Sequence, residues 1–326
     1  MLLLTKAVFA IMIGFLSSVV LGFFMVPILR KLRIGQKISI FVGEAHRKKE
    51  GTPTMGGLIF IVPTVCATIG LIVLDKVTYT SNIGIVLLVF IGYTLIGFLD
   101  DFLSIRKGDN EGLTVYQKLF MQVLIAIGFF YIYMRSGGQT AWVVGKLHID
   151  LELGWLYGLA ILFVLVGASN AVNLTDGLDG LAGGLSAIAF IAYALISLSV
   201  GFEDVGIFSL ILVGGLFGFL VYNTNPAKIF MGDTGSLALG AAMGAIAILT
   251  HRELTLLVVA FVFVIETLSV IVQTFCVVVF KRKLFLMTPL HHHFEKLGWD
   301  ERDIVKLFWV AGLVLAMAGI IFGVWI

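Results

Sequence analysis

Apolar stretches that are long enough to cross a membrane recur along the whole of this 326-residue chain. An α-helix needs about 20 apolar residues to span the hydrocarbon core of a bilayer, and ten stretches approach that length. They lack the strict polar–apolar alternation that marks the strands of a membrane barrel. The sequence therefore predicts an all-α polytopic membrane protein with one domain over residues 1–326. The predicted spans are Leu4–Leu29, Met55–Leu74, Ile83–Leu99, Val115–Met134, Leu156–Leu174, Leu178–Val200, Val205–Tyr222, Ser236–Leu249, Leu254–Phe280 and Ile304–Ile326.

The composition excludes the soluble alternatives. Charged residues make up 13% of the chain, about half of their usual share in soluble globular proteins. Hydrophobic residues make up 60%, and the mean hydropathy is +1.07. Such a chain cannot cover a water-facing surface, which excludes a soluble enzyme, a disordered protein and a coiled coil. The net charge of +2 gives no indication of binding to nucleic acid, and none is expected.

The lysines and arginines are divided unevenly between the two sides of the predicted membrane. Seventeen of the 22 basic residues fall in the loops after the first, third, fifth, seventh and ninth spans. Basic loops of membrane proteins stay in the cytoplasm. The sequence therefore predicts that these loops are cytoplasmic. With ten spans, both termini are predicted to face outward.

Carboxylates are scarce, and they gather at the predicted cytoplasmic ends of the spans. Asp100 and Asp101 end the third span, Asp176 and Asp179 lie between the fifth and the sixth, and Asp233 follows the seventh. Charged groups near membrane depth usually line a water-filled site. The alternative interpretations are that an acid solvates a helix end, or that Asp233 caps the next helix. We predict an active site on the cytoplasmic face, built from several separate segments.

Adjacent carboxylates such as Asp100 and Asp101 repel one another, which predicts a neutralising metal ion, a lysine, or both. Mg²⁺ suits the site better than Zn²⁺ because the candidate ligands are oxygens. Basic residues near the acids, including Lys49 and Lys118, suit an anionic and phosphorylated substrate. The alternative is that these cations serve only as the topology signal.

A polar segment at Asn170–Gly180 is the most specific of these features. Asn173, Asp176 and Asp179 are spaced by three and lie roughly on one side of a helical turn. Gly177 interrupts this turn. Unwound polar backbone at membrane depth is tolerated where it lines a cavity. The segment is therefore predicted to line the site.

Three consecutive histidines, His291, His292 and His293, follow the ninth span. Neighbouring side chains of an extended segment point to opposite faces, so one metal ion is not expected to take all three. Imidazoles can instead serve a phosphate site as donors or proton carriers. Within the ninth span, Glu266 and Gln273 are seven residues apart and share a helix face. Glu266 fits the proton relay of a transporter, a position near the interface, or a hydrogen bond across helices.

Five motifs in order along the chain are those of a known family: Gly51–Gly57, Asp100–Asp101, Asn170–Gly180, Asn223–Ser236 and Pro289–Glu295. Through them the chain resembles the polyprenyl-phosphate N-acetylhexosamine-1-phosphate transferases. The triple histidine followed by Phe-Glu favours the branch of phospho-N-acetylmuramoyl-pentapeptide transferases (MraY) over the branch that uses UDP-N-acetylglucosamine.

The resemblance implies an Mg²⁺-dependent enzyme of the bacterial inner membrane. It would transfer phospho-MurNAc-pentapeptide from UDP-MurNAc-pentapeptide to undecaprenyl phosphate, giving lipid I and UMP in peptidoglycan synthesis. Its partners would be these two substrates and membrane lipid, and the resemblance allows a homodimer. The alternatives are a UDP-GlcNAc:polyprenyl-phosphate GlcNAc-1-phosphate transferase and a proton-coupled anion transporter. A transporter would need polar groups near the middle of the bilayer and internal symmetry, and no repeat is found.

The resemblance also implies roles for individual residues. Asp233 would bind Mg²⁺, Asp100 would deprotonate or position the lipid phosphate, and Asp101 would assist with metal or phosphate. Phe230 would stack on uracil. The residues expected to contact the nucleotide-sugar are Lys49, Thr54, Asn173, Asp176, Asp179, Asn223, Phe230 and Gln273. The three histidines would bind the phospho-sugar region, and Lys118 would meet a substrate phosphate.

Two chemical routes stay open at this point. A lipid phosphate is already largely ionised near neutral pH, since its second pKa is about 6, which favours direct attack on the nucleotide-sugar. The alternative is a two-step route through an aspartyl phospho-sugar intermediate.

The charge distribution gives a testable topology. With Cys66 and Cys276 replaced, single cysteines at positions Ser104 and Met287 should react with membrane-impermeant thiol reagents only from the cytoplasmic side. A cysteine at Gln139 should react only from outside. Labelling in right-side-out and inverted vesicles measures both. Outside labelling at position 104 would reverse the orientation.

Overall fold

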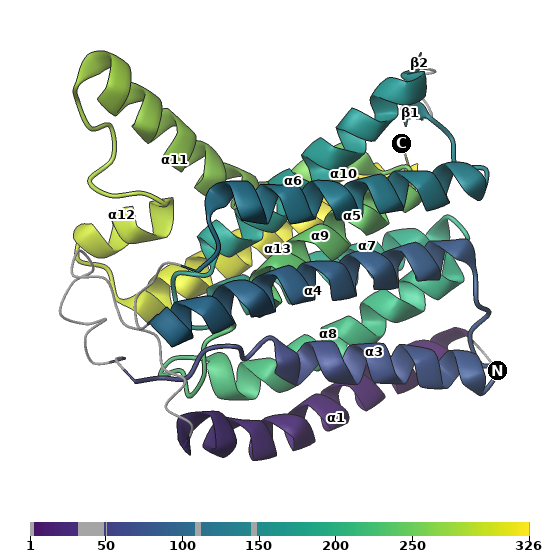
Figure 1. Ribbon diagram of the computed structural model, residues 1–326, viewed down its shortest axis with the longest axis horizontal. Helices are drawn as coiled ribbons and strands as arrows, with labels where there is room; N and C mark the ends of the chain where they lie inside the picture. Colours follow the sequence, from purple (N-terminus) through teal and green to yellow (C-terminus); the bar gives the residue numbers. More distant parts are fainter. Residues whose placement is uncertain (1–2, 32–48, 50, 108–111, 145–148, 326) are drawn as a thin grey trace.

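The computed structural model describes residues 3–31, 49, 51–107, 112–144 and 149–325, and it is almost entirely helical (Figure 1). A two-stranded antiparallel hairpin, β1–β2, joins α5 to α6. The elements are α1 (Leu3–Lys31), α3 (Leu58–Val73), α4 (Ser81–Lys107), α5 (Val115–Arg135), β1 (Ala141–Val144), β2 (Ile149–Glu152), η2 (Gly154–Leu156), α6 (Tyr157–Thr175), α7 (Leu181–Ser199), α8 (Glu203–Asn223), α9 (Gly232–Leu249), α10 (Glu253–Val259), α11 (Phe261–Phe280), α12 (Leu290–Lys296) and α13 (Glu301–Trp325).

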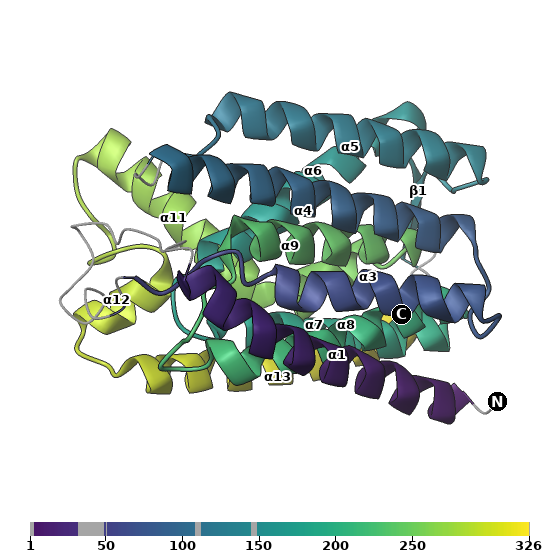
Figure 2. The ribbon, with the colours of Figure 1, turned by 60° about the horizontal axis from the view of Figure 1, so that its bottom comes forward.

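The long helices run side by side and alternate in direction, so that the loops collect at two opposite ends of the bundle (Figures 1 and 2). Within the described residues, nine helices are long and apolar enough to cross a membrane. Helix α3 is the shorter apolar element, with 16 residues, and it coincides with the second predicted span. Both chain ends lie at the end of the bundle opposite α12. These features confirm a polytopic membrane protein.

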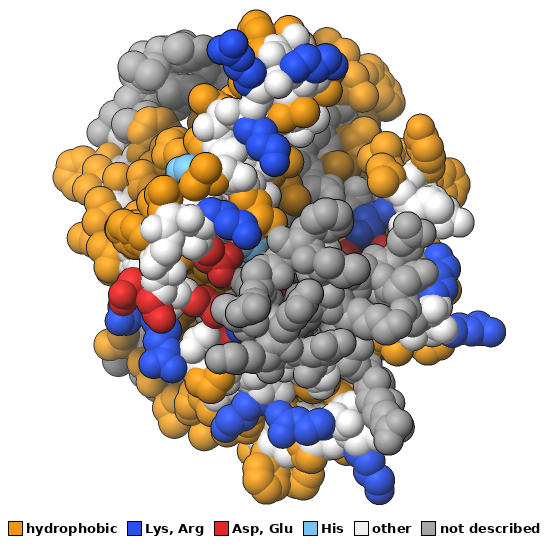
Figure 3. All heavy atoms as spheres, turned by 90° about the vertical axis from the view of Figure 1, so that its left-hand side faces the viewer, with side chains coloured by type: hydrophobic (Ala, Val, Ile, Leu, Met, Phe, Trp, Pro, Cys, Tyr) orange, Lys and Arg blue, Asp and Glu red, His pale blue; other side chains and the backbone are white. Residues whose placement is uncertain are grey.

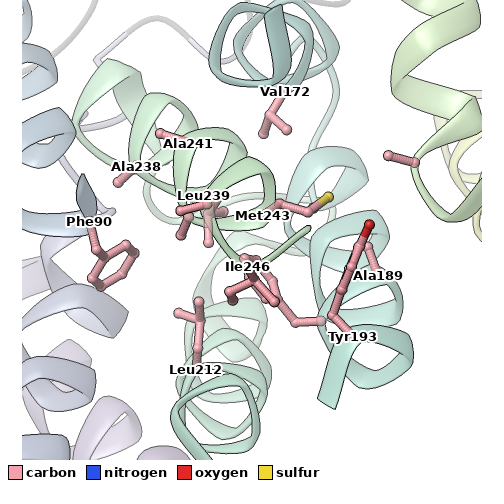
Figure 4. Packing of buried hydrophobic residues seen from close by; sticks show 14 of the residues in the cluster. Phe90, Val172, Ala189, Tyr193, Leu212, Ala238, Leu239, Ala241, Met243 and Ile246 are labelled. Carbon is pink, nitrogen blue, oxygen red and sulfur yellow. The ribbon is translucent and has the colours of Figure 1, made fainter. Parts of the chain in front are cut away.

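Helices α7, α8 and α9 form the centre of the bundle. Between 78% and 89% of their apolar windows is buried, against 22% for α1 and 17% for α5. Figure 4 shows Leu239, Met243 and Ile246 of α9 packed among side chains of the neighbouring helices. The peripheral helices instead expose large apolar side chains, as expected of surfaces that face lipid. The central position of α9 matters because its first turn carries Asp233.

Glycine allows α9 to pack directly against the backbone of α6. A Cβ atom at Gly240 would lie 2.2 Å from the carbonyl oxygen of Ala168. Association of helices in lipid depends on such close packing, because apolar side chains gain little by leaving a solvent that is itself apolar. The sequence of α9 is rich in Ala and Gly, which are small residues. In the structure they are what permits its burial.

Two local predictions from the sequence are wrong. The ninth span is not one continuous helix, because it breaks at Ala260 into α10 and α11, and α11 leans away from the bundle (Figure 1). No Gly or Pro marks this break. The sixth span is confirmed as α7, which begins at Leu181, directly after the left-handed Gly180 at φ +81°. The three histidines lie in a helix, α12, and not in an extended segment.

The close contact at Gly240 yields a stability prediction. Gly240→Ala should destabilise the protein by about 1–3 kcal/mol, because the new methyl group overlaps the Ala168 carbonyl. Gly167 is the matched control, since a Cβ atom there meets no atom within 4 Å. Gly167→Ala should leave stability unchanged or raise it by up to about 1 kcal/mol. Thermal unfolding in detergent measures both, and equal melting temperatures would contradict this packing.

Candidate active site

The site begins where α4 meets the first turn of α9. Asp101 accepts hydrogen bonds from the backbone amides of Asp233 (3.2 Å) and Thr234 (3.0 Å) and from the Thr234 hydroxyl (2.6 Å). Its side chain is buried, with 6% of the residue exposed. A helix leaves its first backbone N–H groups without partners inside the helix, and Asp101 satisfies two of them from a neighbouring helix. Asp101 therefore caps α9.

This arrangement leaves the carboxylate of Asp233 free to face the site. The Lys118 Nζ atom lies 2.6 Å from Asp233 Oδ2 and 3.2 Å from Asp100 Oδ1. Asn173 donates to Asp233 Oδ1 at 2.7 Å and to the Ser236 hydroxyl at 2.9 Å. The interpretation of Asp233 as a mere helix cap is therefore wrong. Its two oxygens join α9 to α5 and α6.

Local sequence signals place the lysine at this point. Thr114 and Gln117 form a capping box, each side chain bonded to the other's backbone amide, which fixes the start of α5. Lys118 follows directly, within the first turn. Asp100 is held by the Leu113 amide at 3.0 Å, just before that helix begins. The segment that starts α5 thus orients both partners of the ion pair.

Glycines let the backbones of three segments converge on the acids. A Cβ atom at Gly97 would lie 2.1 Å from the carbonyl oxygen of Asp233. Gly232 has φ +74°, and a Cβ atom there would lie 2.5 Å from Asp101 Oδ2 and 2.6 Å from Thr54 Oγ1. Thr54 is buried beside them, and its hydroxyl has no hydrogen-bond partner within the described structure. The segment that carries Thr54 is pinned on both sides, because Phe230 N donates to Pro53 and Gly56 N to Phe230.

A second cluster surrounds Lys49. Its Nζ atom lies 2.7 Å from Asp179 Oδ1 and 2.6 Å from Glu301 Oε1. Asp179 Oδ2 accepts from the Ala227 amide at 2.9 Å, and Asn225 donates to Glu301 at 2.9 Å. Asp179 is buried. This network ties the start of α7, the loop after α8 and the start of α13 to the segment that precedes α3.

Asn223 and Gln273 each bond their side-chain amide to backbone. Asn223 accepts from the Gly180 amide (3.1 Å) and donates to the Ile229 carbonyl (2.9 Å). Gln273 donates to the Phe285 carbonyl and accepts from the amides of Leu284 and Phe285. Both residues are buried. They hold the loops that border the site, whereas the Phe230 ring is only half-buried.

The three histidines of α12 have different partners. His291 is fully buried, its Nδ1 atom lies 3.3 Å from Glu266 Oε2, and its backbone amide donates to Glu266 Oε1. His292 pairs with Glu295 at 2.6 Å, and His293 accepts from the Leu286 amide at 3.2 Å. Glu266 therefore bonds across helices, which was one of the three interpretations of its place in the span.

Asp176 lies at the end of α6, outside the membrane-spanning helices, close to the acids of both clusters. Burial of its carboxyl raises its pKa above the ordinary value, and the negative charges of Asp233, Asp101 and Asp179 raise this pKa further. Its side chain accepts no hydrogen bond from any residue that the structure describes. A raised pKa favours the protonated carboxyl, which can donate as well as accept a hydrogen bond.

Two carboxylates of this arrangement fit a metal ion. Across the described ranges, no three His, Cys, Asp or Glu side chains are grouped as ligands of one metal. Asp101 is committed to the α9 cap, but Asp100 and Asp233 are partly exposed and share one lysine. Mg²⁺ is usually held by one or two carboxylates, waters and substrate phosphates. The donor set of Asp100 and Asp233 fits that mode.

Basic and acidic side chains share this end of the molecule. Figure 3 looks onto it and shows Lys and Arg around carboxylates, with apolar side chains along the flanks. The acids, amides and Lys118 come from α4, α5, α6 and α9, as the sequence predicted when it brought separate segments to one face. The contacts among these side chains confirm that convergence, whereas the prediction that the histidine segment is extended is wrong.

Comparison with known proteins decides the family. The model described as Glycosyl transferase family 4 matches residues 83–251, and signature 1 of the phospho-N-acetylmuramoyl-pentapeptide-transferases matches residues 49–61. Proteins named phospho-N-acetylmuramoyl-pentapeptide-transferase from Geobacillus sp. (strain WCH70) and Geobacillus thermodenitrificans (strain NG80-2) are each 48% identical to the chain over 319 residues. That of Bacillus subtilis (strain 168) is 47% identical, and each match covers 98% of both chains. The chain belongs to the phospho-N-acetylmuramoyl-pentapeptide-transferase family.

The resemblance drawn from the five motifs is thereby confirmed. Signature 1 of the phospho-N-acetylmuramoyl-pentapeptide-transferases includes Lys49 and Thr54. Lys49 belongs to the second cluster, and Thr54 lies beside Gly232 at the start of α9. The Glycosyl transferase family 4 match includes Asp100, Lys118 and Asp233. Both clusters therefore draw on segments that the family models describe.

Sequence reasoning missed Glu301. This carboxylate holds Lys49, the Asp179 amide and Asn225 together, yet in the sequence it is one of several charges before the last span. The available signal was its position in the first turn of α13. This signal is easily overlooked, because an acid in a first turn is usually explained by the helix dipole alone. Only the packing of α13 against α7 brings it to the cluster.

The two aspartates at the start of α9 should respond differently to removal of their charge. Asp101→Asn should lower stability by about 0.5–2 kcal/mol, because it weakens the cap of a buried helix. Asp233→Asn should keep the melting temperature, because the Asp233 side chain does not cap the helix. It should lower turnover by about a hundredfold or more, because its negative charge faces Lys118 in the site. Thermal unfolding and UMP release measure the two effects. Equal losses of stability would contradict the separate roles.

Proposed function

We propose that the chain carries out the reaction after which its relatives are named. It transfers phospho-MurNAc-pentapeptide from UDP-MurNAc-pentapeptide to undecaprenyl phosphate and releases lipid I and UMP. The observation that carries this proposal is the lysine-bridged pair of partly exposed carboxylates, Asp100 and Asp233, at one end of a membrane bundle. The family membership supports it independently.

The reaction brings two phosphorylated groups together, and their mutual repulsion must be offset. Lys118 supplies one positive charge between Asp100 and Asp233. When a substrate phosphate enters, the ammonium group can pair with it, since phosphate oxygens are strong acceptors for charged donors. Asp100 then positions the lipid phosphate or takes its remaining proton. Lys118 and Asp100 thus form the part of the site that faces the acceptor.

Mg²⁺ is the proposed cofactor, and Asp233 with Asp100 would hold it. Bound there, it would neutralise charge on the diphosphate and on the leaving UMP. Asn173 fixes the orientation of Asp233 through one oxygen, which keeps the carboxylate directed toward the site. Asp101 contributes indirectly, by holding the turn from which Asp233 projects.

The nucleotide-sugar would bind along the remaining predicted residues. Phe230 is half-buried and can stack on uracil, and Asp176 can bond the base or the ribose. Asp179, Asn223 and Gln273 already bond within the protein, so we assign them to shaping the pocket. Direct contacts would come from Lys49, Thr54, Asn173 and the exposed edges of His292 and His293, because His291 is fully buried.

The proposed placement in the cell follows from the same end of the bundle. With α3 counted as a crossing, ten spans put both termini outside and the acids in the cytoplasm, where the basic residues are concentrated. Undecaprenyl phosphate keeps its chain in lipid and its phosphate at the interface. We place the enzyme in the bacterial cell membrane, with its site at that depth.

A substrate panel tests the function. The purified protein, Mg²⁺ and undecaprenyl phosphate are held constant while UDP-MurNAc-pentapeptide or UDP-GlcNAc is supplied in detergent. We expect UMP and a lipid-linked product from UDP-MurNAc-pentapeptide only. Product from UDP-GlcNAc alone would assign the sister reaction. A transferase needs no gradient and should work in detergent, whereas a transporter would give no product there. The absence of turnover with both substrates would therefore reject the transferase proposal.

A rapid-quench experiment separates the two chemical routes. With undecaprenyl phosphate rigorously removed, enzyme and UDP-MurNAc-pentapeptide should release no burst of UMP, because an ionised lipid phosphate is itself a competent nucleophile. Asp100→Asn should slow the complete reaction strongly yet leave residual activity. A stoichiometric burst with phospho-sugar trapped on Asp100 or Asp101 would establish the two-step route.

A further inference from the structure

A groove distinct from the acid site lies between α1 and α8, at the same end of the bundle. It has a volume of about 550 Å³ and is lined by both apolar and basic side chains. Phe23, Val26 and Tyr222 provide apolar walls. Three cations, Arg30, Lys31 and Lys228, are exposed at its border. Of these residues only Lys228 lies in one of the sequence motifs, Asn223–Ser236, and the proposed reaction assigns a role to none of them.

The shape of the groove has a local cause in α1. Gly22 has no side chain, and a Cβ atom there would lie 2.3 Å from the ring of Tyr222, which packs onto the helix at this point. The Tyr222 hydroxyl donates to the Val19 carbonyl at 2.7 Å and holds the ring in place. Pro27 lies one turn and a half further along the same helix, where its ring removes a backbone hydrogen bond. The Tyr222 ring, held in this position, therefore lines the groove beside Gly22.

The lining is chemically complementary to an anionic phospholipid. Apolar walls on the flank of a membrane helix meet acyl chain, and the cations lie at the helix end, where a lipid phosphate would be. Arg30 donates to the Lys228 carbonyl at 3.4 Å, so the cations of α1 and of the loop after α8 are close together. Among the described residues, the lining holds three cations and no carboxylate, which favours a negative headgroup over a zwitterionic one.

The groove also touches the loop that supports the active site. Lys228 lies between Asn225, which bonds Glu301, and Phe230, whose amide bonds Pro53. The Lys228 amide donates to the Tyr222 carbonyl at 2.7 Å, so the groove and the loop share backbone. A phosphate bound to Lys228 would hold this loop and hence the turn that leads to Asp233.

We propose that the α1–α8 groove binds an anionic diacyl phospholipid of the cytoplasmic leaflet, with the phosphate on Arg30, Lys31 and Lys228 and a chain along Phe23, Val26 and Tyr222. The bound lipid stabilises the 224–230 loop and so strengthens binding of the nucleotide-sugar. This second effect rests on the proposed function, whereas lipid binding itself does not.

Native mass spectrometry of the full-length protein with phosphatidylglycerol measures binding without catalysis. Arg30→Gln with Lys228→Gln should weaken binding of the tightest phosphatidylglycerol on the order of 25-fold, since each basic residue near a headgroup contributes about fivefold. Lys228→Gln alone, outside the helices, should weaken it about fivefold. Arg282→Gln with Lys283→Gln removes two exposed cations beyond α11 and should have no effect on this lipid. Equal losses in the control would overturn the site.

Competitors identify the occupant. Phosphatidylcholine and soluble glycerol 3-phosphate should fail to displace phosphatidylglycerol, because one lacks net charge and the other lacks chains. Displacement by glycerol 3-phosphate would show a phosphate-only site, and selective displacement by undecaprenyl phosphate would show an acceptor site. Either result overturns the phospholipid proposal.

Activity in nanodiscs tests the coupling. Raising phosphatidylglycerol in phosphatidylcholine from 0 to about 30% should lower KM for UDP-MurNAc-pentapeptide in the unaltered protein and in the Arg282/Lys283 control. In the Arg30/Lys228 variant KM should not respond, while kcat stays similar. Lipid binding without a change in KM would remove the coupling, and lipid binding by a protein without transferase activity would reject the proposed function but keep the site.

Discussion

The carboxylate of Asp101, buried between α4 and α9, is the contact on which the site depends. The first amides of α9 have no partner inside the helix, and an unpaired polar group that is buried from water is costly. Asp101 satisfies the amides of Asp233 and Thr234 from outside the helix. Because this task falls to a neighbour, Asp233 is released from capping its own helix and can face Lys118. Stability and chemistry are thereby divided between carboxylates on different helices.

The same division recurs in the second cluster. Asp179 and Glu301 hold Lys49 while they fix the loop after α8, and Asn223 fixes the start of α7 to that loop. These buried groups are costly to assemble but, once fully bonded, they define one arrangement of segments that are far apart in the sequence. The residues with exposed or unbonded atoms, such as Asp176 and Phe230, remain to meet a ligand. The α1–α8 groove touches this frame through Lys228, which is why lipid there could influence the nucleotide-sugar.

Sequence patterns predicted most of the helices because lipid imposes a simple rule on composition. Stretches near 20 apolar residues correspond to α1, α4 to α9 and α13, and the scarcity of charge made each surviving carboxylate informative. The break at Ala260 was not predictable, since neither Gly nor Pro marks it and the apolar run continues across it. The helical form of the histidine segment was likewise missed, because seven residues carry too little periodicity to reveal a helix.

What the sequence by itself determined is the membrane class of the protein, its family and the end of the bundle at which its polar residues meet. Composition and motif order carry that information without knowledge of any contact. Only the tertiary structure decided the separate tasks of Asp100, Asp101 and Asp233, since identical side chains differ here by which helix each one faces. It also brought Glu301 to Lys49 across more than 250 residues of chain. Such pairings depend on how the helices pack, and that packing is decided by many small contacts, like Gly97 against Asp233, which no local pattern encodes.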